Sequence, residues 1–187
     1  MKKLLIGLAG RARSGKTTAA KHLASAHTLQ TYAFADPLRE GLTAIFNLSQ
    51  RDFDDEHKEQ PIGWLGRSTR ELMQSMGTEW GRNQIHPELW LLLAEQNLGF
   101  LEQTNPVATG FVISDLRFEN EAAFVRDKGG LVIHLLRESA PGVNPHSSEA
   151  GISIHDNDFV VHNDETIEQM TGQLDEILNA LRVRAAA

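Results

Sequence analysis

The sequence contains no cysteine, and this absence removes several classes of protein at once. Disulfide frameworks, thiolate-bound zinc, iron–sulfur clusters and thiol nucleophiles all depend on that side chain. The lack of cysteine is compatible with a reducing compartment.

Long hydrophobic runs are also missing. No stretch reaches the ~20 apolar residues that a membrane span needs. The apolar start over residues 1–10 is too short for a secretory signal, and basic residues follow it at once. We therefore expect a soluble protein with no membrane partner, located in the cytoplasm.

The sequence also lacks an excess of basic residues. The chain has 18 Lys and Arg against 25 Asp and Glu, a formal net charge of −7. Broad binding to duplex nucleic acid needs a basic face, so we expect no nucleic-acid partner, although a local anion site remains compatible with this charge. The 187 residues predict one domain, and the 41% of hydrophobic residues are enough for a core.

Apolar runs typical of buried strands alternate with helical patterns along the chain. Strands are expected over residues 3–9, 29–34, 110–114, 131–136 and 158–161. Helices are expected over residues 15–26, 36–46, 68–83, 87–103 and 118–128, and from about 164 onward, while residues 49–66 form a polar connection. This alternation predicts an α/β fold with a parallel sheet and helices on both faces.

The most informative segment follows the first apolar run. It matches the phosphate-loop pattern G-x-x-x-x-G-K-[ST] in full, and it reads Gly10, Arg11, Ala12, Arg13, Ser14, Gly15, Lys16, Thr17. Glycine lets the backbone approach phosphate oxygens closely, and the helix that follows presents N–H groups and a partial positive charge. Lys16 would reach the β- and γ-phosphates and Thr17 would offer a hydroxyl to Mg²⁺. The pattern predicts binding of a nucleoside triphosphate but leaves the acceptor open.

Asp115 follows the third apolar run, where this architecture usually holds Mg²⁺ directly or through water. The alternative is that Asp115 caps the next helix. Leu116 and Arg117 come next, so the water-activating glutamate of many ATPases is missing, and no Asn-Lys-x-Asp guanine signature is present. This combination favours transfer to a bound acceptor over hydrolysis.

A polar stripe in the middle of the chain supplies candidate acceptor contacts. Polar side chains recur every four residues, at Arg70, Gln74, Thr78 and Arg82. Two arginines suit a phosphate monoester, and the amide and hydroxyl suit a base edge. The alternative is an ordinary solvated helix face. Asp36 could hold a sugar hydroxyl, orient an arginine or cap its helix, whereas His134 is expected in the core rather than as a ligand.

Taken in order, these motifs resemble the P-loop deoxynucleoside monophosphate kinases of the bacteriophage type. The segments that carry the resemblance are GRARSGKTTAA, YAFADPLRE, RELMQSMGTEWGR with Trp90, VISDLRFENEA, HSSE at 146–149 and VHNDETIEQM. They cover nearly the whole chain and are specific in combination, whereas the phosphate loop alone would not separate this family from its relatives.

The resemblance implies a fold and a set of site residues. The fold would be a single three-layer P-loop kinase domain with a five-stranded parallel sheet, a helical monophosphate-binding region at about 36–105 and a small lid at about 137–150. ATP and Mg²⁺ would be the cofactors, with ATP on residues from Gly10 to Thr18 and near Asn163, and with Thr17 and Asp115 at the metal. The monophosphate would meet Phe34, Ala35, Asp36, Arg70, Gln74, Thr78, Arg82, Trp90 and Glu149. Catalytic roles would fall to Lys16, Asp36, Arg117 and Arg137, and His146 would help to position the lid.

The predicted reaction transfers the γ-phosphoryl group of ATP to a (deoxy)nucleoside monophosphate. Two alternatives stay open at this point. One is another small-molecule kinase of the same fold, of the phosphomevalonate or dephospho-coenzyme A type, and the other is a nucleotide-switched binding module without an acceptor. A homodimer is also compatible with the sequence.

Overall fold

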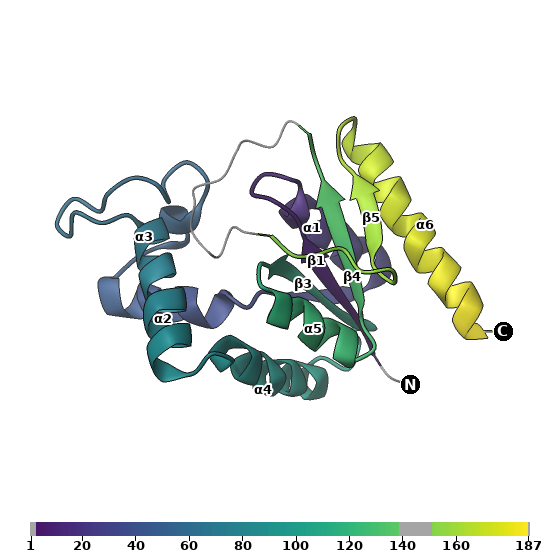
Figure 1. Ribbon diagram of the computed structural model, residues 1–187, viewed down its shortest axis with the longest axis horizontal. Coiled ribbons are helices and arrows are strands. Elements are labelled where there is room, and N and C mark those ends of the chain that lie inside the picture. The colour runs from purple at the N-terminus through teal and green to yellow at the C-terminus, as the bar shows by residue number, and fades with distance from the viewer. Residues whose placement is uncertain (1–2, 139–150, 187) are drawn as a thin grey trace. The chain divides into compact units, whose positions relative to one another are not determined.

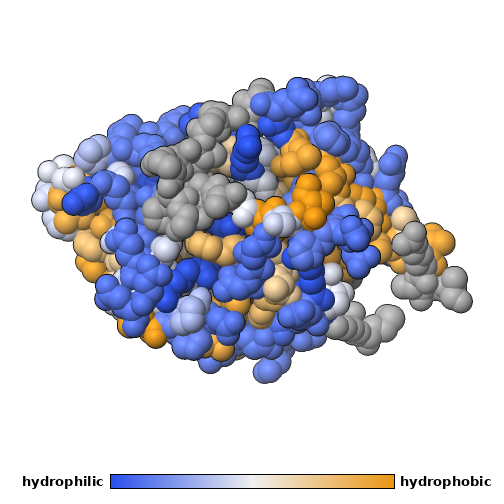
Figure 2. All heavy atoms as spheres, in the orientation of Figure 1, coloured by the Kyte–Doolittle hydropathy of each residue, from blue (hydrophilic) through white to orange (hydrophobic). Residues whose placement is uncertain are grey.

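The computed structural model describes residues 3–138 and 151–186 of the chain. Its contacts divide the chain into two compact units, one formed by Met1–Ala33 with Leu101–Ala187 and the other by Phe34–Phe100. Within the described residues, none of the helices is both long and apolar enough to cross a membrane. The face drawn in Figure 2 is mostly hydrophilic, with hydrophobic side chains confined to smaller areas.

The first unit is built on a five-stranded parallel sheet in the order β2-β3-β1-β4-β5 (Figure 1). The strands are β1 (Leu4–Ala9), β2 (Leu29–Tyr32), β3 (Gly110–Leu116), β4 (Leu131–Leu136) and β5 (Phe159–His162). Both neighbours of the central β1 are reached through crossovers, so the carboxyl end of β1 lies at the switch point where parallel sheets bind ligands.

Helices cover both faces of this sheet. On one face, α1 (Lys16–His27) and α6 (Ile167–Ala186) pack onto the strands, and Leu23 and Leu174 join Ile6 and Leu8 in the main core. Alternate strand residues face opposite sides. Accordingly Gly7 faces the other layer, where Val125 of α5 (Glu119–Asp127) would lie 3.1 Å from a Cβ at that position. The predicted three-layer α/β fold is confirmed.

The second unit is helical. It contains α2 (Asp36–Phe46), a 3₁₀ turn (Gln50–Phe53), α3 (Thr69–Gln74), a π-helix (Ser75–Ile85) and most of α4 (Leu89–Thr104), which ends in the first unit. One α-helix over 68–83 was expected from the sequence, and this expectation is wrong because the bonding changes to i→i+5 after Gln74.

The change of helix type coincides with tight packing against α4. Trp90 is buried and its indole N–H donates to the carbonyl of Gly77 at 2.8 Å. A side chain at Gly81 would lie 2.9 Å from the same indole ring. Because Gly81 carries no side chain, the indole ring of Trp90 can pack directly against the backbone of the π-helix.

The remaining element boundaries differ from the sequence predictions by small amounts. The last helix begins at Ile167 rather than near residue 164, and β3 continues two residues beyond the predicted end at 114. The N-cap of α2 is Ala35, so Asp36 is the first helical residue and not the cap. The Asp36 carboxylate instead contacts the guanidinium of Arg39 at 3.3 Å, which is the predicted alternative of orienting an arginine.

Candidate active site

The phosphate-loop motif connects β1 to α1 and adopts a conformation that requires its glycines. Gly10 and Gly15 have φ angles of 144° and 102°. A Cβ at Gly10 would lie 2.5 Å from the carbonyl oxygen of Leu135, and one at Gly15 would lie 2.5 Å from the amide nitrogen of Asn163. No side chain caps the start of α1 and its first turn holds no acidic residue, so this end of the helix suits an anion.

Lys16 folds back over the loop that precedes it. Its ammonium nitrogen donates to the carbonyl oxygens of Gly10 at 2.6 Å and Arg11 at 2.8 Å. The charge is therefore held over the backbone on which phosphates would rest. Within the part of the chain that the structure describes, the buried hydroxyl of Ser14 has no hydrogen-bond partner. Arg11 and Arg13 are exposed, as are Thr17 and Thr18 on the first turn of α1, whereas Ala12 is half-buried.

Asn163 supports the loop from the segment between β5 and α6. Its side-chain amide donates to the carbonyl of Ser14 at 2.9 Å, and its backbone N–H donates to Leu136 at the end of β4 at 2.8 Å. The resemblance implies that ATP lies near this residue, and this stays a prediction. The contacts in the structure are to the loop backbone and to the end of β4, so Asn163 links the phosphate loop to the sheet.

We expect Asn163→Ala to raise the KM for ATP about fivefold, the worth of one hydrogen bond of about 1 kcal/mol. Because the contact is to the loop, the KM for GTP should rise by the same factor, and steady-state kinetics with both nucleotides measures this. Asn179→Ala, an exposed position on α6, is the control. A loss confined to ATP would instead indicate an adenine contact.

Asp115 is buried at the carboxyl edge of β3. Ala9, the last residue of β1, pairs with Leu116, so Asp115 lies beside the strand that leads into the phosphate loop. The alternative role as a helix cap is wrong, because α5 begins at Glu119 with Phe118 as its N-cap residue. A buried carboxylate and the Thr17 hydroxyl are hard oxygen donors, the kind that Mg²⁺ prefers, so this donor set fits the metal.

The start of α5 is organised by a residue that the sequence analysis did not single out. Glu121 is buried, and its carboxylate accepts the backbone N–H groups of Arg117 at 2.7 Å and Phe118 at 3.2 Å. This fixes the turn after Asp115 and leaves the Arg117 side chain exposed. A glutamate three residues after an N-cap position is the signal that could have found it.

Arg137 follows β4 at the same edge of the sheet and is exposed. The next residue, Glu138, donates its backbone N–H to the carboxylate of Asp164 at 2.7 Å, which ties the end of β4 to the segment before α6. The other predicted lid residues, His146 and Glu149 among them, lie outside the described residues.

The segment that precedes β5, residues 151–158, is anchored by the buried carboxylate of Asp158. Asp158 accepts hydrogen bonds from the guanidinium of Arg126 at 2.6 and 3.0 Å, from the ring of His134 at 2.9 Å and from the N–H of His155 at 3.0 Å. Burial alone would raise the pKa of Asp158, but these hydrogen bonds outweigh it and lower the pKa to about 2. His134 is thus a core residue, as predicted.

The polar stripe of the second unit stays half-buried through both helix types. An α-helical turn holds 3.6 residues, whereas a turn closed by i→i+5 bonds holds more than four. Side chains four residues apart are therefore displaced around the helix axis in one direction in α3 and in the opposite direction in the π-helix. The four predicted residues are all half-buried: Arg70, Gln74, Thr78 and Arg82.

Three residues of this stripe have surroundings that bear on acceptor binding. Arg70 pairs with the carboxylate of Glu59 at 3.2 Å, and Arg82 donates to the carbonyl of Pro87 at 3.3 Å. The side-chain nitrogen of Gln74 is buried and makes no hydrogen bond to any described residue. An unsatisfied buried donor is costly, so Gln74 is suited to a polar ligand.

The remaining predicted substrate residues differ in exposure. Phe34 is buried just after β2, and Ala35 and Asp36 are half-buried. Trp90 was predicted to contact substrate, but its ring is buried against the π-helix and its N–H is bonded to Gly77. Its observed role is therefore to support the segment that carries Thr78 and Arg82.

Comparison with known proteins identifies the family. A family model described as deoxynucleotide monophosphate kinase matches residues 56–174. A protein of Acanthamoeba polyphaga mimivirus to which the same name has been assigned is 36% identical to this chain over 182 residues. The match covers 91% of this chain and 94% of the mimivirus protein. The chain belongs to the deoxynucleotide monophosphate kinase family. It is a kinase, as its sequence predicted.

More distant relatives agree with this membership. The deoxynucleotide monophosphate kinase of Enterobacteria phage T4 is 31% identical over 114 residues, which cover 61% of this chain and 46% of the phage enzyme. The chain therefore matches about half the length of that relative. The solved structure of TT1252 from Thermus thermophilus aligns with 97% of this chain and 99% of its own at a TM-score of 0.50 and 17% identity, a likeness of fold alone.

Proposed function

We propose that this deoxynucleotide monophosphate kinase uses ATP with Mg²⁺ and transfers the γ-phosphoryl group to a deoxynucleoside 5′-monophosphate, giving ADP and the diphosphate. The observation that carries the proposal is the phosphate loop, with Lys16 folded over its backbone carbonyls, in a chain of this family. We further propose that the protein acts in the cytoplasm of the host, without nucleic acid.

The donor nucleotide would rest on the first unit. The amides from Gly10 to Thr18 would receive its phosphates, and Lys16 would exchange its carbonyl contacts for β- and γ-phosphate oxygens. Thr17 and Asp115 would hold Mg²⁺, which when bound neutralises charge on the same oxygens. Arg117 and Arg137, both exposed at the edge of the sheet, would supply further positive charge.

The acceptor needs no strong general base. The second pKa of a phosphate monoester is about 6, so the attacking oxygen is already ionised at neutral pH. The difficulty is to bring two polyanions together in line, and the protein's contribution is therefore positioning and charge neutralisation. Asp36, which contacts Arg39, would act by positioning rather than by accepting a proton.

Acceptor binding is assigned to the half-buried stripe of the second unit. Arg70 and Arg82 would grip the phosphate and Gln74 would meet the base edge with its unsatisfied amide nitrogen. Arginine binds phosphate through a planar fork that lysine cannot reproduce. The stripe would therefore select a phosphate group by its geometry as well as by its charge.

We expect Arg82→Lys and Arg70→Lys each to raise the KM for the monophosphate about 10- to 100-fold, the worth of a charge-assisted hydrogen bond of about 1.5–3 kcal/mol. The KM for ATP should change less than twofold, as steady-state kinetics with each substrate varied in turn will measure. Arg67→Lys is the control, because Arg67 lies just before α3 and pairs with Glu71 on the exposed surface. An unchanged monophosphate KM in both variants contradicts the assignment.

A coupled ADP-release assay over all common ribo- and deoxyribonucleoside monophosphates tests the function. We expect each accepted deoxynucleotide to raise ADP formation far above the rate with ATP alone, and the ribonucleotides to do so less. Phosphomevalonate and dephospho-coenzyme A complete the panel. Activity with either of these and none with any nucleotide contradicts the proposal.

A further inference from the structure

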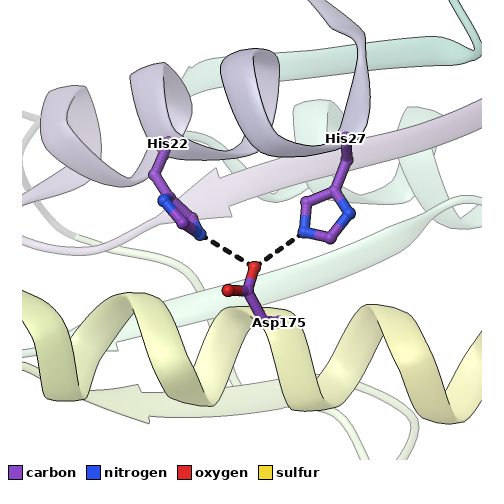
Figure 3. Close-up of side chains that lie close together, drawn as sticks. All are labelled: His22, His27 and Asp175. Carbon is purple, nitrogen blue, oxygen red and sulfur yellow. Dashed lines mark hydrogen bonds and ion pairs between the residues drawn. The ribbon is translucent and has the colours of Figure 1, made fainter.

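Two histidines of α1 converge on one carboxylate of α6. The Nε2 atoms of His22 and His27 lie 2.8 and 2.7 Å from the same oxygen, Oδ1 of Asp175. Figure 3 shows both rings reaching down from α1 toward this oxygen, while the second carboxylate oxygen points to the side. The rings meet edge to face, with centroids 6.2 Å apart. Two nitrogen donors and an oxygen donor thus share one small space between two helices.

The chemistry of this cluster is that of a transition-metal site. Its three ligand atoms lie within 4.8 Å of one another. Imidazole nitrogen and carboxylate oxygen together suit zinc and similar ions, whereas Mg²⁺ and Ca²⁺ prefer oxygen alone. We propose that His22, His27 and Asp175 bind a zinc-class divalent cation that clamps α1 to α6, with water completing the coordination.

Binding an ion requires the three side chains to adjust. Tetrahedral zinc with bonds of about 2.0–2.2 Å holds its ligand atoms roughly 3.3 Å apart. Each imidazole nitrogen must therefore draw back from Asp175 by about half an ångström, and the two nitrogens, which lie within 4.8 Å of each other, must also come to this spacing. His27 is buried, His22 is 23% exposed and Asp175 is 39% exposed, so the solvent side offers the ion a route and a place for water.

The arrangement of donor atoms favours a cation at this point. One carboxylate oxygen of Asp175 lies within hydrogen-bond distance of two imidazole nitrogens, and a mixed nitrogen and oxygen donor set of this kind suits a divalent transition-metal ion. Without the ion, the same three side chains form two hydrogen bonds between the helices, and this is the competing interpretation.

The proposed site would act on stability rather than on chemistry. Lys16 begins α1 and His27 ends it, so a clamp at His22 and His27 restrains the far half of the helix that carries the phosphate loop. Leu23 of α1 and Leu174 and Leu178 of α6 belong to the same hydrophobic core cluster. A bound ion would add a link between the two helices to this apolar packing.

Thermal unfolding of the whole chain, stripped of metal and free of nucleotide, tests the proposal. We expect Zn²⁺ at a hundredfold excess over its Kd to raise Tm by about 5 °C or more, and calorimetry to give one ion per chain. Mg²⁺ at the same concentration should leave Tm unchanged. Co²⁺ bound in place of zinc should give visible absorption of a nitrogen- and oxygen-bound ion.

Variants separate the metal site from a pair of hydrogen bonds. His22→Gln and Asp175→Asn keep polar side chains and should abolish the zinc-dependent rise in Tm and the one-ion stoichiometry. His57→Gln is the matched control, because His57 also contacts a carboxylate, Asp54 at 2.8 Å, but without a second histidine at that carboxylate. All of these variants should keep kinase activity in zinc-free buffer with Mg²⁺. A wild-type chain that zinc does not stabilise, or variants that zinc stabilises equally, would overturn the proposal.

Discussion

Replacement of Lys16 by alanine is expected to lower kcat for phosphoryl transfer roughly 10²–10³-fold, while the fold survives. The Lys16 ammonium lies 2.6 and 2.8 Å from two loop carbonyls and would move onto the transferring phosphoryl group. Its charge is needed where negative charge concentrates in the transition state, and removal of one such group costs about 10²–10³-fold in comparable sites. Single-turnover kinetics with saturating ATP measures the loss.

The matched control for this variant is Lys21→Ala. Lys21 lies five residues further along the same helix and is exposed, so its removal changes the net charge of α1 equally. We expect Lys21→Ala to keep kcat within about twofold, and both variants to show wild-type circular dichroism. Full activity in Lys16→Ala would remove the phosphate loop from the mechanism.

Asp158→Asn is expected to have the largest effect on stability. The carboxylate of Asp158 is 2% exposed and binds the guanidinium of Arg126 and the ring of His134. Removal of one partner leaves the other charge poorly compensated, which typically costs 3–5 kcal/mol. We expect a loss of about 3 kcal/mol, equivalent to a fall in Tm of about 6–12 °C for a chain of this size.

Calorimetry against Asp156→Asn checks this expectation. Asp156 is two residues away and exposed, so the control removes the same charge from the same segment without the buried contacts. We expect the control to unfold within about 1 °C of the wild type. Equal Tm values for both variants would show that the buried network contributes nothing to stability.

The same carboxylate predicts a dependence of stability on pH. Its pKa is about 2 in the folded chain and 3.8 for an unperturbed aspartate, so protons bind the unfolded state more readily. The stabilisation from Asp158 is therefore complete above pH 3.8 and is lost as the pH falls toward 2. In Asp158→Asn this contribution should be missing from the acid limb of a Tm-against-pH curve.

The parts of the fold that sequence predicts well are those specified locally. Apolar patterns placed all five strands within two residues of their observed ends. The central strands β1, β3 and β4 are buried on both faces and are therefore mostly apolar, whereas the edge strands β2 and β5 are only partly buried. The phosphate loop was found for the same reason, since its glycines and lysine lie within eight residues of sequence. Local cues are weaker at helix starts, and the cap of α2 was misplaced by one residue.

Features that depend on distant partners were not predicted. The π-helix is accompanied by Trp90, whose indole reaches back thirteen residues to Gly77. Asp158 meets Arg126 and His134 across 32 and 24 residues, and Asp175 meets His22 across 153. No spacing rule connects such positions in a single sequence, because the contacts form only when the chain has folded and has brought distant elements together.

The central claim is tested most directly by following one phosphorus atom. ATP labelled on its γ-phosphoryl group is incubated with the protein, Mg²⁺ and a deoxynucleoside monophosphate, and the products are separated by chromatography. We expect the label in the β-phosphoryl group of the deoxynucleoside diphosphate, and transfer by Lys16→Ala that is slower by roughly 10²–10³-fold. Label found only in inorganic phosphate, with every monophosphate tried, would contradict the account.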